Sequence, residues 1–230
     1  LVEFAEASSH RSSGPFDLVL VEGSISTPDQ LEEIIHIRRQ TPLLVTIGAC
    51  ATAGGIQALR NWRDQEAMHN AVYALPEYVE SLATSTPISD HVTVDAELRG
   101  CPIDPGQLLE LLTALAVGRR PQLPDEAVCL ECKRRGKVCV LVAHDMPCLG
   151  PVTHTGCGAM CPAFDRGCYG CFGPREAANP ASLAQWFGRD GRPDADTAAL
   201  FSGFTAYAKP FRAVIDQLGG PPGPTTPAVA

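Results

Sequence analysis

The distribution of cysteine along the chain constrains the fold more than any other feature of the sequence. Eight of the ten cysteines lie in one stretch, residues 129–171, whereas Cys50 and Cys101 stand alone in the first half. The stretch opens and closes with a CxxC pair. So many thiols in so short a segment predict disulfides, structural zinc or iron–sulfur clusters, and each makes different demands on the chain.

Iron–sulfur clusters account for the cysteines best. A disulfide framework needs an oxidising compartment, and cysteines confined to one part of the chain fit it poorly. Two zinc ions would use eight thiolates but would leave Cys50 and Cys101 without a role. Two cubanes also need eight thiolates, and the glycines and prolines beside many of these cysteines let backbone N–H groups point at cluster sulfurs. Zinc and disulfides remain the alternatives.

The first half of the chain has the pattern of an α/β domain. The apolar run 16–23 predicts a buried parallel strand. Residues 28–40 predict a helix, because apolar residues recur at helical spacing after a Ser-Thr-Pro start and before Pro42. Residues 43–47 predict a second strand, and Gly48–Gly55 a glycine loop, so that the whole is a βαβ unit.

Cys50 and Cys101 each follow a predicted strand. Residues 56–83 predict a helical stretch with an irregular middle, 91–98 a third strand, and 105–117 a leucine-rich helix. In open α/β sheets, ligands bind beyond the carboxyl ends of the strands. The alternative is that each cysteine is a buried small apolar residue, but the glycines beside both let the backbone approach something bulky.

We expect four parts along the chain. Residues 1–124 form the α/β domain, and 125–180 form a loop-rich module held by its ligands rather than by a core. Residues 181–218 form a helical segment that packs on the rest of the chain or on a partner. The Gly/Pro-rich tail 219–230 is expected to be disordered.

Composition excludes several classes of function. The net charge of −8 argues against a nucleic-acid-binding protein, which needs a basic face. No apolar run approaches the roughly 20 residues that span a bilayer. Glu3 and Glu6 stand where a signal peptide would be basic. We therefore expect a cytoplasmic protein without a membrane span.

Six short motifs occur along the chain: Val21-Glu22-Gly23-Ser24-Ile25, Gly48-Ala49-Cys50-Ala51-Thr52-Ala53-Gly54-Gly55, Gly100-Cys101-Pro102, Cys148-Leu149-Gly150-Pro151-Val152-Thr153, Gly156-Cys157-Gly158 and Gly167-Cys168-Tyr169-Gly170-Cys171-Phe172-Gly173-Pro174. Together they resemble the small subunit of [NiFe] hydrogenases, most closely the cytoplasmic kind coupled to pyridine nucleotides, including the sulfhydrogenase delta subunit. The 20 kDa subunit of NADH:quinone oxidoreductase is a more distant relative. The resemblance covers residues 1–175 and implies a flavodoxin-like first domain.

The resemblance also implies a proximal [4Fe-4S] cluster in that first domain. Its ligands in the family are an N-terminal CxxC, a Cys in the GxCxxxGG loop and a Cys in a GCP turn. Cys50 and Cys101, here the proximal pair, match the last two. The CxxC has no counterpart, so we expect an N-terminally incomplete chain, with true loss of the proximal cluster as the alternative.

Two complete clusters are implied in the cysteine-rich part. The distal [4Fe-4S] cluster takes Cys129, Cys132, Cys139 and Cys148, the distal set, with Cys129 where many members have His. The medial set is Cys157, Cys161, Cys168 and Cys171. Periplasmic members lack the Cys161 thiolate and hold a [3Fe-4S] cluster, so the resemblance implies a [4Fe-4S] cluster of lower potential here, suited to NAD(P)H or ferredoxin.

The function implied is an electron relay between a nickel–iron large subunit and flavin/NAD(P)-binding or ferredoxin-like partners. Hydrogen chemistry takes place in the partner, and the NiFe centre and flavin belong to partner subunits. A 20 kDa-type subunit of a quinone-linked respiratory complex is the alternative. Such subunits usually carry one cluster, so the eight-cysteine stretch counts against it.

Several other polar residues have two interpretations. Glu22 either lies at the large-subunit interface or caps a helix, and His10 is more typical of a surface than of a ligand. His144 and His154 are not needed as ligands. The basic run Lys133, Arg134, Arg135 and Lys137 is either a solvated face or a docking patch for an acidic partner.

Overall fold

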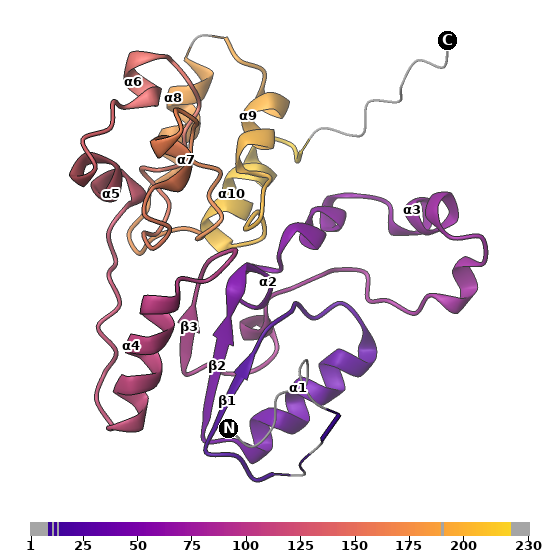
Figure 1. The fold of residues 1–230 in the computed structure, drawn as a ribbon. Coiled ribbons are helices and arrows are strands. Elements are labelled where there is room, and N and C mark those ends of the chain that lie inside the picture. Colours follow the sequence, from indigo (N-terminus) through magenta and orange to yellow (C-terminus); the bar gives the residue numbers. More distant parts are fainter. Residues whose placement is uncertain (1–8, 11, 13, 190, 222–230) are drawn as a thin grey trace.

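The computed structural model describes residues 9, 10, 12, 14–189 and 191–221 (Figure 1). Its centre is a parallel sheet of β1 (Leu18–Val21), β2 (Leu43–Ile47) and β3 (Ala96–Leu98) in the order β1-β2-β3. Parallel neighbours need a crossover connection, which the chain supplies through the segments between the strands. The predicted α/β class with a parallel sheet is confirmed.

Two helices cover opposite faces of the sheet, α1 (Pro28–Gln40) and α4 (Pro105–Ala116) (Figure 1). Successive residues of a strand point to opposite faces. Leu44 of β2 accordingly packs in one apolar cluster with α1, and Val45 packs in another with α4. Both side chains are fully buried, and each such burial contributes about 1.5–3 kcal/mol.

The predicted helix 28–40 is confirmed to the residue, and its start shows why. Thr27 is the N-cap, and its side chain accepts the Gln30 N–H while the Gln30 side chain accepts the Thr27 N–H, a reciprocal capping box. Pro28 occupies the first turn, where its missing N–H costs nothing. The predicted helix 105–117 is also confirmed, ending at Ala116.

The predicted loop 48–55 is wrong in its first six residues, which form the short helix α2 (Gly48–Ala53). Gly48 has φ of +83°, so the chain turns directly from β2 into a helix. Gly54, at φ of +77°, ends α2 in the left-handed conformation that favours glycine.

The predicted strand 91–98 is paired only at its last three residues. The Leu44 N–H, which a longer ladder would give to a backbone carbonyl, goes instead to the Asp95 carboxylate at 2.8 Å. Arg38 takes up the Thr93 carbonyl at 3.2 Å. The Asp95 N–H still donates to the Leu44 carbonyl at 2.9 Å, so side chains replace only part of the ladder before β3.

The predicted irregular helical stretch 56–83 is confirmed in its first part. It contains the 3₁₀ helix η1 (Ile56–Trp62), α3 (Gln65–Val72) and η2 (Pro76–Tyr78). The last five residues are irregular, and a further 3₁₀ turn, η3 (Ile88–Asp90), precedes β3. Helix α3 lies away from the sheet (Figure 1).

Residues 125–180, the cysteine-rich segment, contain little regular structure. Its helices are α5 (Val128–Arg134), α6 (Val140–Ala143) and α7 (Met160–Ala163). Two isolated bridges, Ala127 with His154 and Thr153 with Pro174, hold its loops together. Its small apolar cluster consists of Val128, Val140, Ala159 and two of the cysteines, Cys148 and Cys168.

Three C-terminal helices confirm the predicted helical segment: α8 (Pro180–Gly188), α9 (Asp194–Phe201) and α10 (Lys209–Gln217). They pack on one another and on Leu149 and Val152 of the cysteine-rich segment. The Trp62 indole N–H donates to Asp216 at 2.7 Å, which ties α10 back to η1. The predicted disordered tail lies, from residue 222 onward, outside the described residues.

In the described ranges, no helix is long and apolar enough to cross a bilayer.

Candidate functional site

The ten cysteines, all of them within the described residues, are free thiols. No disulfide joins any of them. They lie beyond the carboxyl ends of the strands, in or beside the cysteine-rich segment (Figure 1).

The distal set comes together around α5. Burial first, and then the charges of Cys148, Cys139 and Cys132, raise the pKa of the Cys129 thiol to about 11. Burial, followed by Cys148 and Cys139, likewise raises the pKa of Cys132. Each thiol thus lies within electrostatic reach of the others. Because burial disfavours free thiolates, a bound cationic metal is what would keep these sulfurs ionised.

The medial set is also a group of neighbours. Burial, followed by Cys157 and Cys161, raises the pKa of Cys171 to about 11. Burial raises the pKa of Cys168 furthest, and both Cys148 and Cys157 raise it too. Cys161, the fourth thiol of this set, feels burial first and then Cys157. The structure thus brings together the four residues that the resemblance implied.

The proximal pair is joined through the backbone at the sheet edge. The Ala49 N–H donates to the Gly100 carbonyl at 2.9 Å, which places the start of α2 against the Gly100-Cys101 turn. Burial, and then the charge of Cys50, raises the pKa of Cys101. The Cys50 thiol lies 3.8 Å from Oε1 of Gln57, a contact that the sequence analysis missed.

The three groups form a row with the medial set in the middle. Cys101 of the proximal pair lies within electrostatic reach of Cys171. At the other end, the Cys168 N–H donates to Sγ of Cys148 at 3.2 Å. Cys139 and Cys101 are exposed, whereas Cys148 and Cys168 are buried. The row is therefore most buried where the medial and distal sets meet, and its exposed thiols belong to the proximal pair and the distal set.

Phe172 separates the proximal and medial groups. A Cβ on Gly100 would lie 2.7 Å from its ring, and a Cβ on Gly156 would lie 2.5 Å from it. Both glycines have positive φ, +129° and +142°. Each directly precedes a cysteine, so the bulky group that the Gly-Cys pattern near Cys101 accommodates is this ring.

Other glycines leave room beside the sulfurs. A Cβ on Gly150 would lie 3.3 Å from the Cys148 sulfur and 3.4 Å from the Cys129 sulfur, and one on Gly55 would lie 2.6 Å from the Cys50 sulfur. The Gly170 N–H donates to Sγ of Cys168 at 3.4 Å. Thiols in glycine cradles with N–H donors fit iron–sulfur clusters, whose potentials such hydrogen bonds tune.

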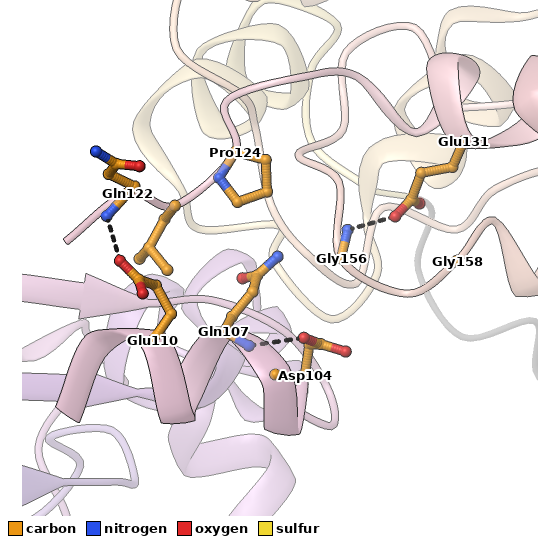
Figure 2. Close-up of a pocket in the computed structure, with 10 residues that line it drawn as sticks. Asp104, Gln107, Glu110, Gln122, Pro124, Glu131, Gly156 and Gly158 are labelled. Carbon is orange, nitrogen blue, oxygen red and sulfur yellow. Dashed lines mark hydrogen bonds between the residues drawn. The ribbon is translucent and has the colours of Figure 1, made fainter. Parts of the chain in front are cut away.

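Glu131, inside the first CxxC pair, links the distal and medial ligand loops. One of its carboxylate oxygens accepts the Gly156 N–H at 3.1 Å (Figure 2). The other accepts the Ala159 N–H at 3.0 Å. These two residues flank Cys157. Sequence analysis missed this role, because it depends on a loop 25 residues away.

Figure 2 shows the cleft of about 480 Å³ that Glu131 lines together with the first turns of α4. Asp104 caps α4 by accepting the Gln107 N–H at 2.8 Å. Hydrogen bonds from Arg119 first, and then from the Gln122 N–H, lower the pKa of Glu110 to about 2. The carboxylates of the cleft therefore already accept hydrogen bonds from other groups of this chain.

His144 and His154, the histidines of the cysteine-rich segment, do not point to a role as ligands. His144 is exposed. His154 is half-buried, its Nδ1–H donates to the Thr155 carbonyl at 2.7 Å, and burial lowers its pKa. We call the described residues before residue 125 the sheet portion. His10 and Glu22 are exposed residues of this portion, and both interact with other groups.

Across the part of the chain that the structure describes, no three His, Cys, Asp or Glu side chains converge closely enough to hold a single metal ion.

Comparison with known proteins places the chain. The family described as NADH ubiquinone oxidoreductase, 20 Kd subunit, matches residues 2–115. The sulfhydrogenase 2 subunit delta of Pyrococcus furiosus is 37% identical over 174 residues, covering 76% of this chain and 73% of that protein. A vhu subunit of the F420-non-reducing hydrogenase of Methanocaldococcus jannaschii is 31% identical over 229 residues, covering 82% and 77%.

A solved structure shares the fold. The actinobacterial-type NiFe-hydrogenase from Ralstonia eutropha H16 aligns with a TM-score of 0.50 at 17% identity, over 98% of this chain and 81% of that one. Sequence identity over three quarters of the chain and the common fold agree with the resemblance carried by the six motifs. The chain belongs to the family of hydrogenase subunits that includes the sulfhydrogenase delta subunit.

Proposed function

We propose that this chain is the electron-relay subunit of a [NiFe] hydrogenase. Hydrogenases are oxidoreductases that act on hydrogen, and hydrogen would be oxidised or formed in a large partner subunit. The single observation that carries the proposal is the row of thiol groups, which runs from Cys50 and Cys101 at the sheet edge through the medial set to Cys148 of the distal set. A row of redox sites moves electrons rather than making bonds.

Two [4Fe-4S] clusters would be held by the distal and medial sets, and the proximal pair would supply part of a third site. When bound, such clusters take up and release single electrons. The chain's own residues hold the sulfurs in place: Phe172 spaces the first two groups, and Glu131 fixes the loop of Cys157 against α5. Gly150 leaves room beside the distal sulfurs.

The family match supports the hydrogenase relay over the 20 kDa-type respiratory subunit. The 20 Kd family matches residues up to 115, which contain only Cys50 and Cys101. The hydrogenase relatives also cover the cysteine-rich segment. The partners that we propose are the large subunit and an NAD(P)-, flavin- or ferredoxin-type acceptor, and the cytoplasmic location stays a prediction.

The first test is the metal content of anaerobically purified protein, with an EPR spectrum after dithionite. Two cubanes require about eight irons and eight acid-labile sulfides per chain, and about twelve irons would indicate a third. Cys129→Ala should remove one set of EPR signals and leave the other, with Cys161→Ala as the matched change in the other set. Zinc without sulfide would refute the proposal.

The type of acceptor is tested by redox titration. Because Cys161 supplies a fourth medial thiol, we expect a [4Fe-4S] potential near or below that of the nicotinamide couple. A medial potential well above that couple would contradict exchange with NAD(P)H or ferredoxin and would leave the relay itself standing.

A further inference from the structure

Two buried threonine hydroxyls lie around Cys168 of the medial set. Thr153 is 1% exposed and Thr205 is 3% exposed. Thr153 belongs to the cysteine-rich segment, whereas Thr205 lies between α9 and α10 in the C-terminal helical segment. Burying a hydroxyl costs free energy unless it forms hydrogen bonds, so the partners of these two groups indicate what the groups do.

Thr205 acts on Cys168 through Gly170. The Thr205 hydroxyl donates to the Gly170 carbonyl at 2.7 Å, and the Gly170 N–H donates to Sγ of Cys168 at 3.4 Å. The same carbonyl already accepts the Gly173 N–H at 2.8 Å, so it does not need Thr205 as a partner. The hydroxyl instead fixes the position of a glycine, at φ of +75°, whose N–H faces the sulfur.

Thr153 lies beside the same sulfur. Burial is the main cause that raises the pKa of the Cys168 thiol, and hydrogen bonds from the Gly170 N–H and the Thr153 side chain act against it. A Cβ on Gly170 would lie 3.8 Å from Oγ1 of Thr153. The Thr153 hydroxyl donates to the Leu149 carbonyl at 2.7 Å, and that carbonyl also accepts the Val152 N–H at 3.1 Å. The hydroxyl can therefore turn to the sulfur without leaving the carbonyl unpaired.

Hydrogen bonds to this sulfur would matter for electron uptake. A sulfur that binds iron is a thiolate, which accepts hydrogen bonds. Reduction adds one electron to a cluster, and donors on its sulfurs stabilise the more negative state. Cys168 is only 8% exposed, and a hydrogen bond is electrostatically stronger in such surroundings than in water. Each donor on this sulfur should therefore raise the potential of the medial site.

We propose that Thr153 and Thr205 set the reduction potential of the medial site through the Cys168 sulfur. Thr153 donates its O–H to the iron-bound sulfur, and Thr205 is a positioning residue that holds the Gly170 N–H on it. The proposal rests on the proposed relay function and deepens it, because it names the residues that control how readily the middle of the row takes up an electron. It also gives the C-terminal helical segment a part in the relay.

The test replaces each hydroxyl with a methyl group of nearly the same shape, as Thr153→Val and Thr205→Val, in the assembled hydrogenase. Thr197→Val in α9 is the matched control, because Thr197 is 2% exposed and its hydroxyl has no hydrogen-bond partner among the described residues. The medial potential is measured by EPR-monitored redox titration, and the medial signal is the one that Cys161→Ala removes. The distal signal of the same sample is the internal reference.

We expect the ratio of reduced to oxidised medial sites at a fixed potential to fall about tenfold in Thr153→Val, which is about 59 mV for a one-electron couple. Thr205→Val should give a smaller fall, because its hydroxyl acts through Gly170. Thr153→Ser and Thr205→Ser keep a hydroxyl and should stay close to the wild-type value. The medial potential of Thr197→Val and the distal potential of every variant should not change.

A medial potential equal to that of the control in both valine variants, at full iron content, would overturn the proposal and leave the relay standing. Equal shifts of the medial and distal potentials would also overturn it, since they would indicate a general loosening of the segment. If Thr153→Val loses iron, Thr205→Val decides, because the Gly170 carbonyl keeps the Gly173 N–H. Wild-type enzyme without an EPR signal from reduced clusters would overturn the relay itself.

Discussion

The sheet portion and the cysteine-rich segment are stabilised in different ways. In the sheet portion, Leu44 and Val45 of β2, Leu98 of β3 and Leu111 of α4 are completely buried, and parallel ladders join the strands. The cysteine-rich segment has short helices and isolated bridges, and its apolar cluster includes two of the proposed ligands. Burial of hydrocarbon suffices for the first region, whereas we expect the second to depend also on what its thiols bind.

Removing the metal should separate the two regions most sharply. After anaerobic chelation, we expect the Leu149 and Thr155 amides to lose most of their protection from hydrogen exchange, because their hydrogen bonds span loops that the ligands hold. The amides of β2 should keep theirs. Exchange measured by NMR or mass spectrometry checks both, and equal loss in both regions would show that they unfold as one unit.

Phe172 tests the boundary where the two regions meet. Phe172→Ala should lower the free energy of unfolding by about 3–5 kcal/mol, as for other buried aromatic side chains. It should also lower iron retention, because the Gly100 and Gly156 loops lose their spacer. Phe187→Ala, in the C-terminal helical cluster, is the control with a similar cost and full iron content. Equal iron in both variants would mean that Phe172 only fills space.

Gly167 tests how tightly the two ligand loops approach within the cysteine-rich segment. A Cβ there would lie 1.8 Å from the Pro147 carbonyl oxygen, so the Cys148 and Cys168 loops would have to separate. We expect Gly167→Ala to cost about 3 kcal/mol and to reduce the iron content. Gly188→Ala, which meets no atom within 4 Å, should change stability by less than about 1 kcal/mol. Denaturant midpoints of the two variants check this, and equal midpoints would show that the loops can separate at no cost.

Asp95 gives the smallest effect, confined to the sheet portion. The Leu44 N–H first, and then Arg38, hold the pKa of Asp95 below its usual range. Because the folded pKa is lowered, the stabilisation is present above the unfolded pKa of about 3.9 and is lost as pH falls through the folded pKa. Asp95→Asn should therefore lower the free energy of unfolding by about 1 kcal/mol near pH 7. Below the folded pKa of Asp95 it should have no effect. A pH-independent difference would assign the effect to packing.

Periodic segments of the sheet portion could be predicted from the sequence. Helix α1 follows from its capping box and apolar spacing, and β1 and β2 follow from short apolar runs. Where side chains replaced backbone partners, prediction failed: nothing local indicates that Asp95 takes the Leu44 N–H and shortens β3. The helical character of Gly48–Ala53 was hidden by Gly48 at its start and by Gly54 and Gly55 after its end.

Sequence analysis named the cysteines of the candidate site but not the residues that hold the cysteine loops in place. The family motifs implied two sets of four cysteines, and the structure gathers these eight thiols in one region, where Cys148 lies within electrostatic reach of Cys129 and also of Cys161 and Cys168. The division into two sets stays a prediction. Glu131 and Phe172 were missed, because their contacts cross to loops far away in the chain. The glycines before Cys101 and Cys157 were the available signal, since a glycine with positive φ beside a ligand indicates a crowded neighbour.

The hydrogen bond from the Cys168 N–H to the Cys148 sulfur limits where the chain can be recombined, in evolution or by engineering. One set's backbone serves the other set's sulfur, so a recombination point between residues 148 and 168 would damage both. A piece that ends at the bridged residues Ala127 and Pro174 would carry all eight of these cysteines. A graft of that piece would transfer the two proposed redox sites together, while Cys50 and Cys101 would stay behind with the sheet.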